Sequence, residues 1–379
     1  MRIELGNPAS LILALERMSF AISARPVVPE LRCVRMSITA GGLDLYGTTG
    51  HLSYSQTVNL DGDLEGTEMV LVDHALLLAA LQTMHGAIEL YTTKTNLIVR
   101  AKDDHKVRSQ IRLAVVENHP EDIRITGPTF TVDAKTVKML VDLLQFAVTR
   151  EGSRPELAGI LFGPMSMSGD GTRLVGYSTE AIESALTVPT QALQPLRSLA
   201  ESEETAEFTV GARWVQCCFG GTSILKFARL AQEFPGVVGD SLTTIRSRTP
   251  EAWFVLDARL AHRTLNALNV YSELAAKQGI SYCTMQKEGE RVYVSVDAPT
   301  AGSFTNELTL VEAGPGDFSV LFSAQAMLDV LSNAGEKVHV AIFSDREPML
   351  ITNPDDDRWA VIQGVMAKSE HVAAEEEDF

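Results

Sequence analysis

The chain has 379 residues, and its 49 acidic against 32 basic side chains give a formal net charge of −17. This length exceeds one ordinary core and predicts two or three domains. Hydrophobic residues at 45% and charged residues at 21% are typical of a soluble globular protein. The acidity argues against a protein that coats nucleic acid electrostatically, although it leaves room for a small basic surface.

The start of the chain and its cysteines both indicate a cytoplasmic protein. No run of 18 apolar residues is present, so we expect no membrane span, and Asn7, Pro8 and Glu16 come too early for a signal peptide. The cysteines lack zinc-ligand spacing and are expected to be buried free thiols: Cys33, Cys217, Cys218 and Cys283. We predict no metal and no cofactor.

Taken in chain order, the sequence opens three similar segments with an amphipathic helix. In each helix the apolar residues recur at helical spacing, and Asp133 and Asp257 stand where N-caps belong. Alternating strands follow, joined by turns that contain glycine at 40–42, 168–171 and 287–290. The opening helices are expected within Asn7–Ser23, Asp133–Thr149 and Asp257–Ala275.

A second pattern follows each of these segments and also recurs three times. It has a polar entry, a helix with Ala-Leu or Ala-Met pairs, a polar break and two alternating strands, over Val72–Val99, Val188–Phe219 and Phe322–Ile351. We therefore expect an α+β protein of three repeated domains, each with two helices packed on antiparallel sheets. The predicted domains are 1–126, 127–249 and 250–368, and 369–379 forms an acidic, solvated tail.

Five stretches in register resemble the bacterial sliding clamp family, the β subunit of DNA polymerase III. "ARPVVPELRCVRMSI" is similar to the family's Arg-Pro-x-x-Pro segment, and the others follow the family's order and spacing. The five stretches are Ala24–Ile38, Leu43–Val58, Arg154–Phe162, Leu230–Val237 and Phe322–Val340. The resemblance covers roughly residues 1 to 368 and implies that two chains close head to tail into a ring of six domains. The dimer interface is then expected around Asn269 to Tyr271.

The resemblance implies a processivity factor that encircles double-stranded DNA and tethers the replicative DNA polymerase. A clamp loader and a second copy of the chain are the other implied partners. No phosphate-binding, zinc-protease or nucleophile motif is present, so we do not expect an enzyme. Two alternatives stay open: an accessory or phage-encoded interaction hub or decoy that does not encircle DNA, and an enzyme with an unrecognised site.

Ring-lining helices would offer Lys and Arg to DNA phosphates, which gives affinity without sequence reading. The candidate DNA contacts are Arg17, Arg25, Lys135, Lys138, Arg150, Arg197, Arg259 and Arg263. Three aspartates in "NPDDDRW", Asp355–Asp357, are compatible with a hard cation, but a solvated hairpin loop explains them better.

The resemblance also implies an apolar cleft between the second and third domains that binds short peptide motifs. Carried over by position, its residues are Leu157, Tyr177, Thr179, Ile182, Pro235, Val361, Ile362, Gly364, Val365 and Met366. The sequence departs from the family at three places. "YSTEAIE" lacks the family's Asp-Gly-His-Arg, "VIQGVMAK" lacks its Met-Pro and terminal Arg-Leu, and Ala326 replaces an aromatic residue at the rim. We therefore expect an altered cleft and an altered partner motif.

Overall fold

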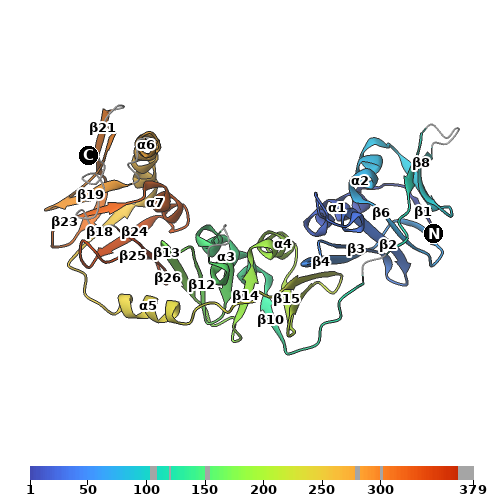
Figure 1. Cartoon of the computed structure of the whole chain (residues 1–379), viewed down its shortest axis with the longest axis horizontal. Coiled ribbons are helices and arrows are strands. Elements are labelled where there is room, and N and C mark those ends of the chain that lie inside the picture. The colour runs from blue at the N-terminus through green and yellow to red at the C-terminus, as the bar shows by residue number, and fades with distance from the viewer. Residues whose placement is uncertain (103–108, 119–120, 150–153, 278–281, 299–301, 366–379) are drawn as a thin grey trace. The chain divides into compact units, whose positions relative to one another are not determined.

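The computed structural model describes residues 1–102, 109–118, 121–149, 154–277, 282–298 and 302–365 (Figure 1). The chain forms two compact units, Met1–Lys138 with Gln191–Arg229, and Met139–Thr190 with Leu230–Phe379. The middle third of the sequence therefore contributes to both units. The boundaries of the three sequence repeats stay a prediction.

The helices follow the predicted order, with one addition. The α-helices are α1 (Ala9–Met18), α2 (His74–Thr83), α3 (Ala134–Leu144), α4 (Thr190–Ala200), α5 (Val237–Arg246), α6 (Ala258–Ala276) and α7 (Ala324–Leu331). Short 3-10 helices are η1 (Ser19–Ala21), η2 (Pro29–Arg32), η3 (Gln145–Ala147) and η4 (Pro155–Leu157). Helix α5 is the addition, because the sequence patterns predict no helix at Val237–Arg246.

The first unit contains two antiparallel sheets. The smaller has the order β5-β1-β7-β8-β9 and the larger β10-β15-β16-β17-β4-β3-β2-β6. Their strands are β1 (Arg2–Leu5), β2 (Cys33–Thr39), β3 (Gly42–Thr48), β4 (Leu52–Val58), β5 (Gly62–Glu65), β6 (Met69–Asp73), β7 (Ala87–Thr92), β8 (Asn96–Lys102), β9 (Gln110–Ala114), β10 (Thr129–Asp133), β15 (Thr205–Val210), β16 (Trp214–Phe219) and β17 (Ser223–Ala228).

The second unit repeats this plan with sheets ordered β14-β11-β12-β13-β26-β25-β24-β18-β22 and β21-β20-β19-β23. Their strands are β11 (Gly159–Phe162), β12 (Met165–Gly169), β13 (Arg173–Ser178), β14 (Leu186–Pro189), β18 (Ala252–Asp257), β19 (Cys283–Glu288), β20 (Arg291–Ala298), β21 (Gly302–Leu308), β22 (Leu310–Ala313), β23 (Phe318–Phe322), β24 (Lys337–Ile342), β25 (Met349–Asn353) and β26 (Asp356–Gln363).

In both units, strands from different sequence repeats join one sheet. β4 of the first repeat pairs with β17 of the second, and β13 of the second pairs with β26 of the third. Helix α1 packs on α2, β3 and β4, and α6 packs on α7, β20 and β21, whereas α5 packs on β13 and β26 (Figure 1). The core of each unit therefore forms between helices and sheets, as expected of an α+β protein.

Local signals explain where several helices begin. The carboxylate of Asp257 accepts a hydrogen bond from the backbone N–H of Leu260 at 2.9 Å, which confirms the predicted cap of α6. Asp73 and Ser323 cap α2 and α7 in the same way. Gly42, Gly171 and Gly289 have φ values of +129°, +93° and +58° at the predicted hairpin turns, where a side chain would strain the backbone.

The cysteines follow the prediction as far as the structure describes them. Cys33, Cys217 and Cys283 are buried, Cys218 is half-buried, and all are free thiols. Burial raises the pKa of Cys217 well above its ordinary value. No helix among the described residues is both long and apolar enough to cross a bilayer.

Candidate functional site

Two adjoining cavities open in the second unit where β13 begins and β26 ends. Their volumes are about 500 and 290 Å³, and both are lined by Gly171, Thr172, Arg173 and Gly364. The backbone N–H of Gly364 donates to the carbonyl of Thr172 at 2.9 Å, which joins the two strand ends. Gly171 lies in the turn before β13 with positive φ, so this turn passes tightly beside the cavities.

The smaller cavity is mostly apolar and lies on the α5 side of the sheet. Its walls include Leu157, Leu174, Pro348 and Ile362, with Ser241 of α5 beside them. Leu174 and Ile362 pack against the buried cluster of α5 and β24–β26, which positions them firmly. Arg154, which is exposed, adds a cation to the wall. We name this space the apolar chamber.

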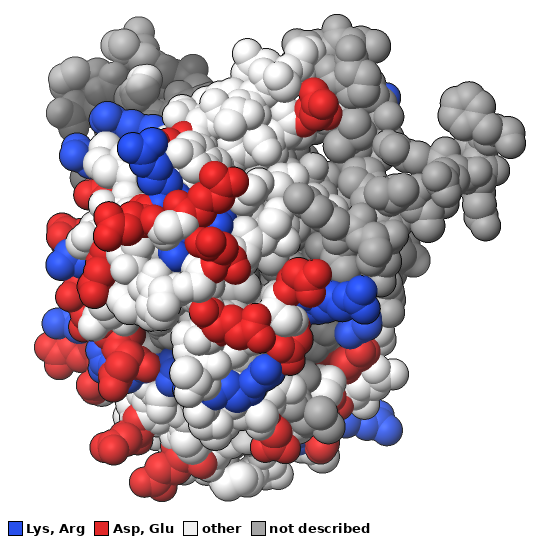
Figure 2. All heavy atoms as spheres, turned by 90° about the vertical axis from the view of Figure 1, so that its left-hand side faces the viewer, with Lys and Arg blue, Asp and Glu red and all other residues white. Residues whose placement is uncertain are grey.

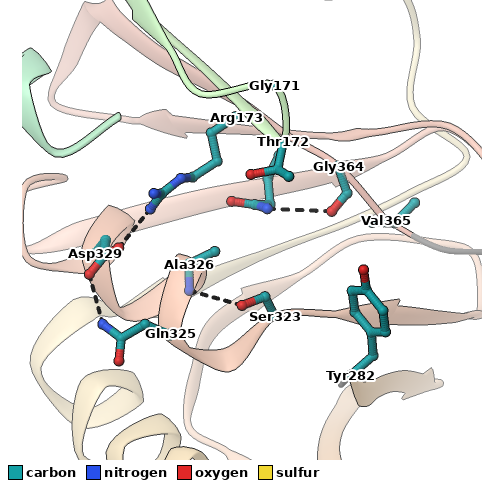
Figure 3. A pocket seen from close by; sticks show the side chains of 11 residues that line it. Gly171, Thr172, Arg173, Tyr282, Ser323, Gln325, Ala326, Asp329, Gly364 and Val365 are labelled. Carbon is teal, nitrogen blue, oxygen red and sulfur yellow. Dashed lines mark hydrogen bonds and ion pairs between the residues drawn. The ribbon is translucent and has the colours of Figure 1, made fainter. Parts of the chain in front are cut away.

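The larger cavity has polar walls and lies on the α7 side. Its lining includes Tyr282, Ser323, Gln325, Ala326, Asp329, Gln363 and Val365. The guanidinium of Arg173 donates to Asp329 at 2.7 Å, and Gln325 donates to Asp329 at 2.8 Å (Figure 3). Arg173 also donates to Asp170 at 2.7 Å. We name this space the polar chamber.

The charges of the polar chamber are held in fixed positions. Burial would raise the pKa of Asp170, but hydrogen bonds from Arg173 and Thr172 outweigh it and hold that pKa below its ordinary value. Tyr282 lies on the Val365 side of the chamber, away from Arg173 and Asp329 (Figure 3). One end of the chamber is therefore ionic and the other aromatic and apolar.

The predicted cleft residues divide between these chambers and the protein core. Those that line a chamber are Leu157, Ile362, Gly364 and Val365. Those that line neither, although the structure describes them, are Tyr177, Thr179, Ile182, Pro235 and Val361. Met366 lies outside the described residues. Ala326, predicted at the rim, lines the polar chamber.

Strand alternation explains why Tyr177 and Val361 lie away from the chambers. A Cβ on Gly176 would meet Leu242 of α5, so Tyr177 points to the opposite face of β13. Val361 pairs with Val175 on that same buried face, whereas Ile362 pairs with Leu174 on the α5 face. Both Tyr177 and Val361 are at most 1% exposed. Val361 is therefore a core residue, whereas Ile362 lines the apolar chamber.

The sequence reasoning missed the segment Asp170–Leu174, which supplies most of the shared wall. Its sequence, Asp-Gly-Thr-Arg-Leu, follows the Asp-Gly-His-Arg-Leu pattern of the family at every position except Thr172. The resemblance instead predicts this segment at Tyr177–Glu183, the end of β13 and the loop that follows it. Pro235 follows Phe234, which is buried in one cluster with Leu157 and Met167. The Phe-Pro segment therefore packs against Leu157, a residue that lines the apolar chamber.

The candidate DNA contacts that the structure describes lie on helices of both units, except Arg25, which lies in the loop between η1 and η2. In the first unit, Arg17 and Lys138 are half-buried, Arg25 and Lys135 are exposed, and Lys138 and Arg197 approach Glu201 at 3.8 and 3.2 Å. In the second unit, Arg259 and Arg263 are exposed on α6 and line a cavity of about 350 Å³ with His262. Arg150 lies outside the described residues.

The surface charge agrees with the acidic composition. On the face seen in Figure 2, acidic and basic side chains are interspersed and the basic ones form no continuous surface. Asp355–Asp357 lie at the turn between β25 and β26, where Asp356 accepts from Arg358 at 2.7 Å. Among the described residues, no cluster of three or more His, Cys, Asp or Glu side chains has a geometry that would hold a metal ion.

The sequence is similar along its length to curated bacterial proteins. It is 20% identical over 369 residues to the "Beta sliding clamp" of Lactococcus lactis subsp. lactis, covering 90% of this chain and 93% of the relative. It is 22% identical over 382 residues to the protein of the same name from Streptococcus pneumoniae serotype 4, covering 93% and 95%. No protein-family model matches the chain.

The fold is similar to solved DNA polymerase β subunits. The β subunit from Streptococcus pyogenes superposes with a TM-score of 0.88 at 16% identity, covering 97% of this chain and all of that one. The DNA polymerase III subunit β from Pseudomonas aeruginosa gives a TM-score of 0.84 at 18% identity, covering 97% of this chain and 100% of that one. Over nearly its whole length the chain is therefore similar in sequence to bacterial β sliding clamps and shares the fold of solved DNA polymerase III β subunits.

Proposed function

We propose that the chain is a DNA sliding clamp, a non-enzymatic processivity factor that encircles duplex DNA in the cytoplasm. The observation that carries this proposal is the match of the clamp fold over 97% of the chain, with relatives named for that role. We assign the three clamp domains to 1–126, 127–249 and 250–368. A clamp holds DNA by topology, so its direct contacts with DNA need only be weak.

The partner that closes the ring is a second copy of the chain. Among the edge strands of the two units are β9 in the first and β21 in the second, each paired on one side only within the described residues, and such edges invite pairing with another chain. Beside β21, Val270 and Leu274 of α6 are 56% and 39% exposed, and Tyr271 contacts Phe304. Head-to-tail pairing of these two ends covers the edges and closes a finite ring.

The two chambers form the cleft through which the clamp holds the replicative polymerase and its loader. Leu157, Leu174, Pro348 and Ile362 offer an apolar surface to aliphatic or aromatic side chains of a partner's peptide. Because Leu157, Leu174 and Ile362 are held by buried neighbours, the cleft is formed before the peptide arrives. We infer that Asp170–Leu174, which lines both chambers in part, belongs to this cleft, and that Tyr177, Thr179 and Ile182 do not.

Retention on circular DNA tests the proposal. The full-length protein is incubated with nicked circular plasmid, ATP and the clamp loader of the same genome, and plasmid-bound protein is isolated by gel filtration in moderate salt. We expect the protein to stay on the circle and to be lost after a restriction enzyme linearises it, because a ring slides off an open end.

Two other outcomes contradict the proposal. Equal retention on circular and linear DNA would show ordinary electrostatic binding. Absence from both forms, with the loader active on its own clamp, would favour the hub or decoy that does not encircle DNA.

A further inference from the structure

The first strand of the second sequence repeat, β10, lacks a neighbour that the first strands of the other two repeats have. In the first repeat β1 pairs with both β5 and β7, and in the third β18 pairs with both β22 and β24. Among the described residues, β10 pairs with β15 alone. The stretch between β13 and β14, Thr179–Ala185, contains no strand, so the second repeat has no counterpart of β5 or β22. One edge of the eight-stranded sheet is therefore open at β10.

The hydrogen bonds at the two ends of β10 fix which of its backbone groups face β15. At one end the N–H of Val210 donates to the carbonyl of Pro128 at 2.9 Å. At the other end the N–H of Ala134 donates to the carbonyl of Glu204 at 2.9 Å. Bonded and non-bonded pairs alternate along an antiparallel ladder, so the even-numbered residues of β10 bond to β15 and the odd-numbered ones do not.

The odd-numbered residues therefore direct their backbone groups toward the open edge. Thr129 and Thr131 present both N–H and C=O there, and Asp133 presents its N–H. Natural sheets often blunt an edge with a proline, a lysine or a bulge, and the strand Thr129–Asp133 has none of the three. A row of unpaired backbone groups without such protection is a template for another strand.

One face of β10 is apolar and incompletely covered at this edge. Phe130 stacks on Phe208 with ring centroids 5.3 Å apart, but Phe130 is only half-buried whereas Phe208 is fully buried. Val132 lies on the same face and is 3% exposed. Cross-strand neighbours on one face of a sheet contact each other, so an apolar side chain on an added strand would cover the open side of Phe130.

The opposite face of β10 is acidic. Thr131 pairs with Glu207 of β15, and Asp133 lies two residues further along the same face. All three residues are exposed. A Lys or Arg side chain opposite Thr131 or Asp133 would lie beside these carboxylates, whereas an acidic side chain would be repelled.

We propose that β10 binds an extended segment of a partner protein by strand addition, and that the side chains of this segment alternate between apolar and basic. Backbone hydrogen bonds to Thr129 and Thr131 supply affinity, and the alternation fixes the register. This site goes beyond the proposed function and does not depend on the cleft, because β10 belongs to the first unit and the two chambers to the second.

A fluorescein-labelled peptide, Gly-Lys-Val-Lys-Val-Thr-Gly, tests the proposal by fluorescence anisotropy with the full-length protein. In antiparallel orientation it sets valine opposite Phe130 and Val132, and lysine opposite Thr131 and Asp133. N-methylation of the second lysine and the threonine removes N–H groups that face β10, so we expect binding at least about tenfold weaker. N-methylation of the two valines is the matched control, because their N–H groups point away, and it should change the Kd by about twofold or less.

Variants of the protein test the same contacts from the other side. Thr131→Pro removes an outward N–H at a position where an edge strand tolerates proline, and should weaken binding at least about tenfold. Thr131→Val keeps the N–H and is its control. Glu207→Gln should weaken binding about two- to threefold, because it removes one of the carboxylates beside the lysines. Thermal unfolding checks that each variant is folded.

Hydrogen exchange locates the bound peptide. We expect the probe to slow exchange of the backbone amides over residues 128–133. Slower exchange at Gly171–Leu174 instead would place the probe in the cleft and overturn the inference.

The remaining outcomes also decide the inference. No saturable binding, equal Kd values for the two N-methylated peptides, or binding that Thr131→Pro leaves intact would each overturn it. A wild-type mass above that of a dimer, reduced by Thr131→Pro, would show that the edge pairs with another copy of the chain, which also overturns it. The clamp function itself is tested separately, by retention on circular DNA.

Discussion

At the scale of single residues, Glu201 partly neutralises two of the cations that we propose as DNA contacts. It follows α4 and draws both Lys138 of α3 and Arg197 of α4 toward its carboxylate, although all three side chains remain about a third to a half exposed. Exposed ion pairs are weak, and phosphates can compete for the same cations. If the proposed DNA contacts hold, this carboxylate weakens them, as a sliding ring requires.

Replacing this carboxylate should tighten DNA binding. Glu201→Gln removes one negative charge and the competitor for Lys138 and Arg197, so we expect the Kd for a short linear duplex at low salt to fall about two- to fivefold. Fluorescence anisotropy with a labelled 30-mer, a length chosen as roughly three turns of B-DNA, measures the change. The matched control is Glu207→Gln, the same change of charge on the exposed face of β15. A variant indistinguishable from this control would show that neither cation contacts DNA.

At the scale of elements, α5 contributes both to the buried core of the second unit and to the wall of the apolar chamber. Leu242 is fully buried in a cluster with Ile245, Phe343 and Leu350, while Ser241 lines the apolar chamber. Gly176 leaves the space into which Leu242 fits, because a Cβ there would lie 2.7 Å from the leucine. The helix is thus held by side chains that come from the sheet and not by its own sequence.

Truncating Leu242 tests this dependence. Leu242→Ala should lower the free energy of unfolding of the second unit by about 2 to 5 kcal/mol, the usual range for a fully buried leucine. Urea unfolding followed by tryptophan fluorescence measures it, since Trp253 and Trp359 lie in this unit. Thr244→Ala changes an exposed residue of the same helix and should shift the midpoint little. Equal midpoints for the two variants would mean that α5 does not depend on this cluster.

At the scale of the whole molecule, the exposed apolar residues of α6 and the edge strand β21 form the interface that we propose between two copies of the chain. Light scattering should give the wild type a mass of about twice 41.2 kDa. Val270→Asp with Leu274→Asp places two charges in the proposed interface and should give the monomer mass at the same concentration. Leu13→Asp, at a residue that is 53% exposed on α1, is the control and should leave the dimer intact. A wild-type monomer at all concentrations, or a dimer in the double variant, would contradict this interface.

The sequence by itself determined the local elements of this protein. Helical spacing of apolar residues, Asp257 as a cap and the glycines of the hairpin turns act over a few residues, so the repeated helix and hairpin pattern could be derived from them. The threefold recurrence then indicated the α+β class and the repeated domain. These features need no knowledge of distant partners.

Only the tertiary structure decided which strands meet across repeats and which side chains reach the cleft. The pairing of β13 with β26 sets Leu174 and Ile362 on the α5 face and Tyr177 on the buried face, and a slip of one residue would exchange them. That register depends on two segments far apart in the sequence. Helix α5 was missed for the same reason, because the surface that stabilises it comes from β24, β25 and β26. The spacing of apolar residues depends only on residues close in the sequence, whereas the cleft is lined by residues that are far apart in the sequence and close in space.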